Sequence, residues 1–202
     1  MALRSTIKRT IKNLFLVLVF PLFCLYWLLS WGGHSDSTFQ SFSQFLSLFP
    51  GKTGIYLRAA FYHLACPNTS DDISIGFLTV LSHRDTTIHQ GVYIGPQCNI
   101  GQCTIGENTL LGSGVHVLSG KNQHHFSDPS IPMKHQGGTF RKIQIGPNCW
   151  IGNVSVIMEN LAEGSIVAAG GIVVKEFAPG DILAAPPSTP IKNRSYEANN
   201  QH

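Results

Sequence analysis

The stretch that decides the fold is "IHQGVYIGPQCNIGQCTIGENTLLGSGVHV", residues 88–117. An aliphatic residue recurs at about every sixth position, and glycine follows most of these residues. A six-residue period fits neither the 3.6-residue turn of a helix nor the two-residue repeat of a long strand. It predicts a triangular solenoid with three short strands in each coil, in which the aliphatic residues point inward and the glycines let the chain turn the corners.

The same register extends beyond the opening stretch. The block from Ile100 to Ile105 is one residue shorter than the others, an irregularity that a coil can absorb. The register residues are Ile88, Ile94, Ile100, Ile105, Leu111, Val117, Ile145, Ile151 and Ile157.

The register is lost between Ser119 and Lys142, where the chain reads "LSGKNQHHFSDPS" at residues 118–130. A long polar loop inside a compact repeat is usually functional. Imidazole is the side chain whose ordinary pKa lies nearest neutral pH, so it suits the removal of a hydroxyl proton. The loop therefore predicts a general base among its histidines, which are His124, His125 and His135.

Three features together resemble the hexapeptide-repeat acyltransferases. They are the hexads, the interrupting loop, and the closing run "SIVAAGGIVVKEFAPGDILAAPPSTPIK" at residues 165–192. The resemblance covers Ile73 to Arg194, and the loop is most similar to that of the O-acetyltransferases of bacterial exopolysaccharide assembly, the colanic-acid type. It implies an all-β fold, a left-handed parallel β-helix, that assembles as a homotrimer with active sites between subunits.

The resemblance also implies the reaction, which is transfer of an acetyl group from acetyl-CoA to a sugar hydroxyl of a surface or exopolysaccharide glycan, in free or lipid-linked form, without a metal. His124 takes the position of the catalytic base, and His125 is its rival. Asp128 is a candidate to orient the imidazole, although an Asp-Pro turn is an equally good interpretation. No enzyme nucleophile is required, because the hydroxyl can attack the thioester directly.

The remaining site residues are also carried over from the family. His83 and Asp85 are candidates for binding the acceptor, with an ordinary turn as the alternative. Ala168 stands where the family has glycine, and the end of the closing run departs from the family pattern, which leaves the nucleotide contacts open. The candidates for binding coenzyme A are Asn153, Ala169, Val174, Lys175 and Lys192.

The first 35 residues predict a membrane-associated helix. Leu14 to Trp31 carry no charge over 18 positions, and basic residues precede them. Pro21 near the middle predicts a kinked or re-entrant helix. Because basic flanks stay cytoplasmic, a full span would place the rest of the chain on the far side, away from cytoplasmic acetyl-CoA. We therefore expect the segment to enter and leave at the cytoplasmic face of the bacterial inner membrane; a cleaved signal peptide is the disfavoured alternative.

Residues 36–69 predict two amphipathic helices that either lie on the membrane or cover the end of the next domain. Asp36 or Ser37 is the expected cap of the first helix, and Arg58 is expected off the apolar face of the second. The β-helix domain then covers residues 70–195, with the loop at 119–142, and residues 196–202 form a tail. The expected apolar positions are Phe39, Phe42, Phe45, Leu46 and Phe49 in the first helix, and Leu57, Ala60, Phe61 and Leu64 in the second.

Composition narrows the alternatives. A formal net charge of +3 with scattered basic residues excludes a nucleic-acid footprint, and five cysteines without a C-x-x-C pair predict buried free thiols. On the same fold, a γ-class carbonic anhydrase-like metal site would recruit His89, His116 and His124. The non-enzymatic alternative is a membrane-tethered β-helical scaffold.

Overall fold

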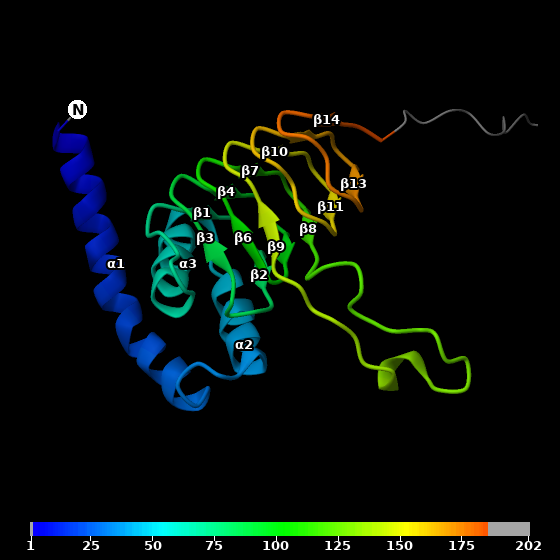
Figure 1. Cartoon of the computed structure of the whole chain (residues 1–202). Coiled ribbons are helices and arrows are strands. Elements are labelled where there is room, and N and C mark those ends of the chain that lie inside the picture. The colour runs from blue at the N-terminus through cyan, green and yellow to red at the C-terminus, as the bar shows by residue number, and fades with distance from the viewer. Residues whose placement is uncertain (1, 186–202) are drawn as a thin grey trace, which may run out of the picture.

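The computed structural model describes residues 2–185 (Figure 1). Three helices come first: α1 at Ala2–Leu29, α2 at Asp36–Ser47 and α3 at Gly51–Ala65. Short strands follow, in coils that stack along one axis. The strands are β1 Ser74–Ile75, β2 Val80–Leu81, β3 Thr87–Ile88, β4 Tyr93–Ile94, β5 Asn99–Ile100, β6 Cys103–Ile105, β7 Leu110–Leu111, β8 His116–Val117, β9 Ile143–Ile145, β10 Trp150–Ile151, β11 Val156–Ile157, β12 Ile166–Val167, β13 Ile172–Val173 and β14 Ile182–Leu183.

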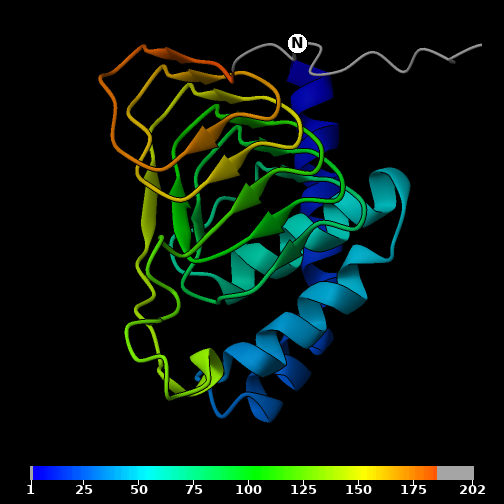
Figure 2. The same ribbon diagram turned by 90° about the vertical axis from the view of Figure 1, so that its right-hand side faces the viewer.

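The strands form three parallel sheets, which we call faces A, B and C. Face A holds β1-β4-β7-β10-β12-β14, face B holds β2-β5-β8-β11-β13, and face C holds β3-β6-β9. The chain visits A, B and C in turn, so each strand pairs with the strand one coil away (Figure 2). Parallel sheets built from a hexapeptide repeat fit the predicted left-handed β-helix.

The predicted register is confirmed. All the aliphatic residues that define it are at most 2% exposed, and they stack on one another from coil to coil. On face B, for example, Ile100 pairs with Val117, and Val117 pairs with Ile157. Full burial of such a side chain contributes about 1.5–3 kcal/mol, so the stack of inward aliphatic residues is the main source of stability.

The glycines have a different role from the predicted one. A Cβ at Gly95 would lie 2.7 Å from the backbone carbon of Gly112, and one at Gly106 would overlap the backbone of Pro147 in the next coil. These glycines are therefore required because the coils stack closely. The backbone turns with positive φ two residues later, at Asn108 for instance, where φ is 56°.

The interrupting loop leaves the stack between β8 and β9, at the corner that joins face B to face C, and projects away from it (Figure 1). Its two arms pair near the base: the N–H of Arg141 donates to the carbonyl of Ser119 at 2.9 Å, and that of Thr139 donates to the carbonyl of Asn122 at 2.8 Å. A short 3₁₀ helix at Met133–His135 lies near the far end. The predicted loop at 119–142 thus coincides with the segment that leaves the stack.

Helices α2 and α3 cover the end of the first coil, one of the two predicted arrangements. In α2, Phe39 and Leu46 are buried, and the Oγ of Ser43 accepts a hydrogen bond from the N–H of Leu81 at 2.8 Å. The cap differs from the prediction, since it is Ser35 whose side chain accepts the N–H of Thr38. The hydroxyl of Ser43 in α2 thus satisfies a backbone N–H at the open edge of the first coil.

Arg58 corrects the prediction for the second helix, because it is fully buried instead of lying off the apolar face. Its Nε donates to the carbonyl of Ile75 at 2.9 Å, and its Nη1 donates to the carbonyls of Leu46 and Phe49 at 3.0 and 2.8 Å. Burial lowers the pKa of the guanidinium from its ordinary value. Arg58 is buried because it supplies the donors that the first coil and the end of α2 lack.

Helix α1 corrects the expectation of a re-entrant segment. It continues from Ala2 to Leu29 with Pro21 inside it, so the chain does not turn back there. Packing on both sides of the proline holds the helix together: the ring of Phe15 stacks on Tyr56 of α3 with centroids 5.2 Å apart, and Tyr26 is buried. Within residues 2–185 this is the helix long and apolar enough to cross a membrane, with a mean hydropathy of 2.0 over the most apolar 18 residues of Thr6–Leu29.

Candidate functional site

The corner between faces B and C gathers most of the predicted site residues into one column. Successive coils place their corner residues above one another, and the loop emerges from the middle of this column (Figure 2). From the first coil to the last, the column includes His83, Asp85, Gln102, the loop, Glu159, Val174 and Lys175.

Ion pairs fasten the base of the loop to this column. The carboxylate of Asp85 accepts hydrogen bonds from Lys142 Nζ at 2.6 Å and Gln102 Nε2 at 2.7 Å. Burial alone would raise the pKa of Asp85, but these two hydrogen bonds outweigh it and lower the pKa. On the other side Arg141 forms an ion pair with Glu159. The predicted acceptor residue Asp85 therefore orients the loop in this structure.

His83 lies beside the loop base, and a carboxylate holds its ring. The distance from His83 Nδ1 to Asp36 Oδ2 is 3.0 Å, and the imidazole lies 5.6 Å from the ring of Phe140 in the loop. The N–H of Arg84 donates to the other oxygen of Asp36 at 2.9 Å. Sequence reasoning missed this role of Asp36, because the two partners are far apart in the chain.

A hollow of about 140 Å³ opens next to His83, on face B at the root of the loop. Its position connects the acceptor candidate His83 with the outgoing arm of the loop. The residues that line it include Ser82, His83, Asn99, His116, Ser119 and Gln123.

The two favoured histidines are exposed on the outgoing arm of the loop. The N–H of His125 donates to the carbonyl of Gly137 at 3.0 Å, so the returning arm holds the backbone at this point. The carboxylate of Asp128 accepts the N–H of Ser130 at 2.9 Å and its hydroxyl at 2.5 Å, and these bonds lower the pKa of Asp128. The structure thus shows Asp128 as a turn residue and does not bring it together with His124.

The coenzyme A candidates lie on two different corners. Asn153 and Ala169 follow face A, in adjacent coils, and the Oδ1 of Asn153 accepts the N–H of Ser113 at 2.9 Å. Val174 and Lys175 lie on the loop corner instead, where Lys175 Nζ is 5.3 Å from the ring centroid of Phe177. The four residues therefore flank face B from both sides. The fifth candidate, Lys192, lies outside the described residues.

A larger hollow, of about 580 Å³, lies along face C and includes His89, Gln144 and Phe177. His116 points outward from face B, so the three histidines of the carbonic anhydrase-like alternative belong to face C, face B and the loop. Within residues 2–185 of one chain, no group of three or more His, Cys, Asp or Glu side chains is placed to hold a metal ion.

Face A carries an outward row of apolar side chains. Strand register places them one above another, and Trp150 is 57% exposed on β10. A flat exposed apolar row of this kind is typical of a protein interface. Its members are Tyr93, Leu110, Trp150, Ile166 and Ile182.

Comparison with known proteins supports the repeat and the fold. Residues 85–119 match the family model described as bacterial transferase hexapeptide (six repeats). A Schizosaccharomyces pombe protein named as an acetyltransferase is 29% identical over 97 residues, which cover 46% of this chain and 44% of that protein. The chain spans less than half the length of the curated relatives it matches.

Two solved structures share the fold. A maltose O-acetyltransferase from Clostridium difficile has a TM-score of 0.62 at 15% identity, covering 72% of this chain and 81% of that chain. A hexapeptide-repeat acetyltransferase from Vibrio cholerae has a TM-score of 0.61 at 16% identity, covering 80% and 93%. These three proteins are named acetyltransferases, which is consistent with an acyltransferase.

Proposed function

We propose that this hexapeptide-repeat chain is an O-acetyltransferase that moves an acetyl group from acetyl-CoA to a sugar hydroxyl of a bacterial surface or exopolysaccharide glycan, in free or lipid-linked form. The observation that carries the proposal is the loop 119–142, which holds a histidine pair outside an otherwise regular hexapeptide stack. A scaffold without catalytic activity gives no reason for this loop. The sugar acceptor and the colanic-acid type of substrate rest on the resemblance of the loop.

His124 is the proposed general base. Its imidazole takes the proton from the sugar hydroxyl while the hydroxyl oxygen attacks the thioester carbonyl. The new C–O bond forms as the C–S bond breaks, and the departing sulfur of coenzyme A receives the proton from the imidazolium. His125, one residue further along the same arm, is the alternative base. Asp128 remains a candidate only if the loop rearranges, because its carboxylate is bonded to Ser130.

The acceptor would bind beside the loop root, where His83 borders the small hollow. The carboxylate of Asp36 keeps the ring of His83 in one orientation, which suits a side chain that must position a sugar hydroxyl. Asp85 would contribute indirectly, by holding Lys142 and with it the returning arm of the loop.

The acetyl donor would lie against face B, between the two corners that carry its candidates. Asn153 and Ala169 present a backbone with small side chains, which fits the narrow pantetheine arm, while Val174 and Lys175 border the loop corner. Since one chain supplies walls on only one side, we propose a homotrimer in which a neighbouring subunit completes the groove. The apolar row on face A supports this assembly, because exposed Trp150 and Leu110 would be buried in it.

The proposed location is the cytoplasmic face of the bacterial inner membrane. Acetyl-CoA is a cytoplasmic metabolite, and the uncharged segment of α1 is suited to lipid. A position at the membrane would bring the site close to lipid-linked glycans.

The test is an assay of the purified protein for release of the coenzyme A thiol in the presence of glycan acceptors. We expect release that requires acceptor and is lost in His124→Ala, together with loss of acetylated glycans, seen by mass spectrometry, from cells that lack the protein. Acceptor-dependent release that persists unchanged in both His124→Ala and His125→Ala would contradict the proposed mechanism.

A further inference from the structure

We propose that helix α1 lies lengthwise in the surface of a lipid bilayer, with one side in lipid and the other packed on α3, instead of crossing the membrane. This inference deepens the membrane part of the proposed function and rests on it, but it does not depend on acyl transfer. It also resolves the topology problem, because the β-helix then stays on the side of the basic N-terminal residues.

The first observation is the division of α1 into two sides. Residues at helical spacing face the protein: Phe15 stacks on Tyr56, and Val19 and Tyr26 are 2% and 1% exposed. The rest of the apolar surface is open, and only 11% of the apolar window is buried, so α1 is not a core helix. The open side includes Leu14, Val17, Leu18, Phe20, Leu25, Trp27, Leu28 and Leu29, which are 48–73% exposed.

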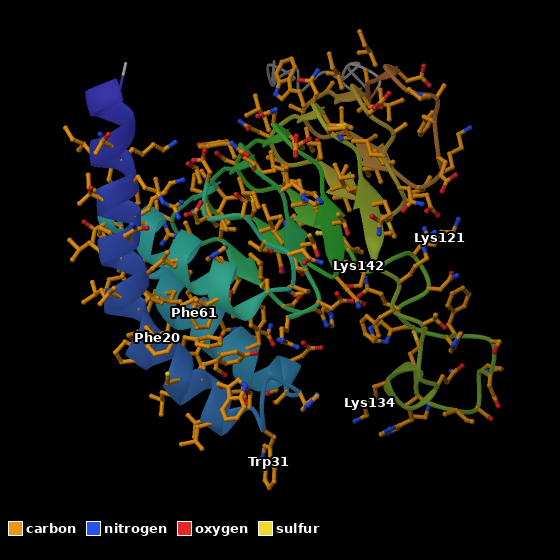
Figure 3. The ribbon with its side chains drawn as sticks, turned by 60° about the vertical axis from the view of Figure 1, so that its left-hand side comes forward. Phe20, Trp31, Phe61, Lys121, Lys134 and Lys142 are labelled. Carbon is orange, nitrogen blue, oxygen red and sulfur yellow. The ribbon has the colours of Figure 1, made fainter. Side chains whose placement is uncertain are left out.

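The composition of this side points to lipid. From Asn13 to Ser35 the chain contains no Asp, Glu, Lys or Arg, whereas a surface that binds a protein is normally rimmed by polar and charged groups. The exposed indoles of Trp27 and Trp31 suit the level of the lipid headgroups. Figure 3 shows Trp31 projecting beyond the end of α1. A helix in the membrane surface buries one apolar side in lipid and keeps the opposite side out of it. In α1 the opposite side is covered by α3, through Phe15 on Tyr56.

The second observation is that the basic end of α1 is fastened to the first coil. Lys8 Nζ lies 2.7 Å from Asp72 Oδ1, Arg9 Nη1 lies 2.6 Å from Asp71 Oδ2, and Lys12 Nζ lies 2.8 Å from Asp72 Oδ1. The first two cations are more than half exposed, so these pairs orient the helix more than they stabilise it.

The other end of α1 is fastened by aromatic packing. The ring of Tyr26 lies 5.5 Å from those of Phe42 in α2 and Phe61 in α3, and 6.1 Å from that of Phe39. Lys12 and Tyr26 are about 21 Å apart along a helix with a rise of 1.5 Å per residue. The protein therefore contacts α1 along most of the length that a crossing helix would need for the bilayer.

This attachment argues against a crossing helix. If α1 stood upright in the bilayer, α3 and the first coil would enter the hydrocarbon with it. The short strands of the first coil, which pack on α2 and α3, would then be drawn toward lipid, where their edges cannot be satisfied. With α1 in the plane of the surface, its open side meets lipid while α3 and the coils remain in water.

Cys24 provides a native probe of this geometry. It is exposed on α1, whereas Cys66, Cys98, Cys103 and Cys149 are buried. Burial raises the pKa of the Cys103 thiol to about 12 and raises those of the other three, so these groups stay protonated and unreactive. A maleimide dye should therefore label Cys24 of the full chain selectively.

The experiment measures depth in vesicles of phosphatidylethanolamine and phosphatidylglycerol. The dye is placed on Cys24, or on Leu14→Cys or Leu28→Cys in a Cys24→Ser background, and quenched by lipids that carry quenchers at different depths. We expect similar, shallow depths at all three positions. A gradient across the hydrocarbon, with one end near each surface, would overturn the proposal in favour of a crossing helix.

A matched pair of variants tests the surface itself. Leu18 on α1 and Ile172 on face B are 62% and 65% exposed. In vesicle flotation, Leu18→Lys should lower binding by about tenfold or more, while Ile172→Lys should bind like the wild type. Equal binding of both variants, or burial of Cys24 by a second copy without vesicles, would overturn the proposal. Acetyl transfer to a water-soluble acceptor should persist in Leu18→Lys, so failure of this inference and failure of the proposed function are distinguishable.

Discussion

The coil stack and the loop 119–142 differ in how their residues are held in place. In the stack, inward aliphatic residues are buried, glycines are fixed by contact with the next coil, and the backbone bonds run from coil to coil. In the loop, most side chains are exposed, and the attachment depends on a few ion pairs and bonds near its base. Figure 3 shows Lys142 where the loop rejoins the stack and Lys134 near its far end.

This difference separates stability from chemistry. Substitutions in the stack should change the free energy of unfolding, whereas substitutions in the loop should change activity with little effect on folding. The predictions below test that separation, beginning with the largest expected change.

Arg58→Met should lower the free energy of unfolding by about 3–5 kcal/mol, because the carbonyls of Ile75, Leu46 and Phe49 lose their donor in a buried place. Denaturant unfolding of the full chain measures the change. Lys134→Met in the loop is the control and should leave the midpoint where it is. A stable Arg58→Met protein would show that the helices do not close the end of the stack.

Gly106→Ala should destabilise the fold by about 1–3 kcal/mol, since the added methyl overlaps the next coil. Gly114→Asn is the matched control: its φ is 66°, and asparagine already occupies the equivalent position at Asn108 and Asn148. Thermal unfolding should separate the two variants. Equal losses would mean that the corner glycines act through φ and not through stacking.

Val154→Asn should stabilise the protein by about 1 kcal/mol. Val154 has a φ of 60° and is 65% exposed, so a β-branched residue occupies a left-handed position without a compensating buried side chain. Val174→Asn, at an exposed position without positive φ, is the control and should not stabilise. A lower midpoint for Val154→Asn would show that the valine side chain has a contact role, for example with another subunit.

The loop base should loosen in acid, which is the smallest expected effect. The hydrogen bonds of Asp85 lower its pKa below the ordinary 3.8, so its contribution to stability is present at neutral pH. That contribution disappears as the pH falls through the folded-state pKa. The amides of Arg141 and Ile143, on either side of Lys142, donate to the carbonyls of Ser119 and Gln102. Their hydrogen exchange should therefore speed up below about pH 4 in the wild type, relative to the exchange of an unfolded peptide. In Asp85→Asn it should be fast at every pH, and a wild-type rate there would contradict the role of the pair.

The sequence was sufficient for the stack because a six-residue period reports burial directly, residue by residue. It also located the loop, since the period stops there. It could not place Arg58, whose burial depends on three carbonyls in the first coil and at the end of α2, nor pair Asp36 with His83 across the chain. The sequence also left the role of Asp128 open. Its carboxylate can accept a hydrogen bond from Ser130 or from an imidazole, and the structure shows the bond from Ser130.

The central claim is that the loop supplies one catalytic imidazole on a stable stack, and the most direct test compares His124→Ala with His125→Ala. The rate of acetyl transfer from acetyl-CoA is measured together with the unfolding midpoint of each variant. We expect His124→Ala to lose about 10²–10⁴-fold in rate with an unchanged midpoint, while His125→Ala stays within a few-fold of the wild type. A wild-type rate in His124→Ala, or a loss that falls on His125→Ala alone, would contradict the assignment.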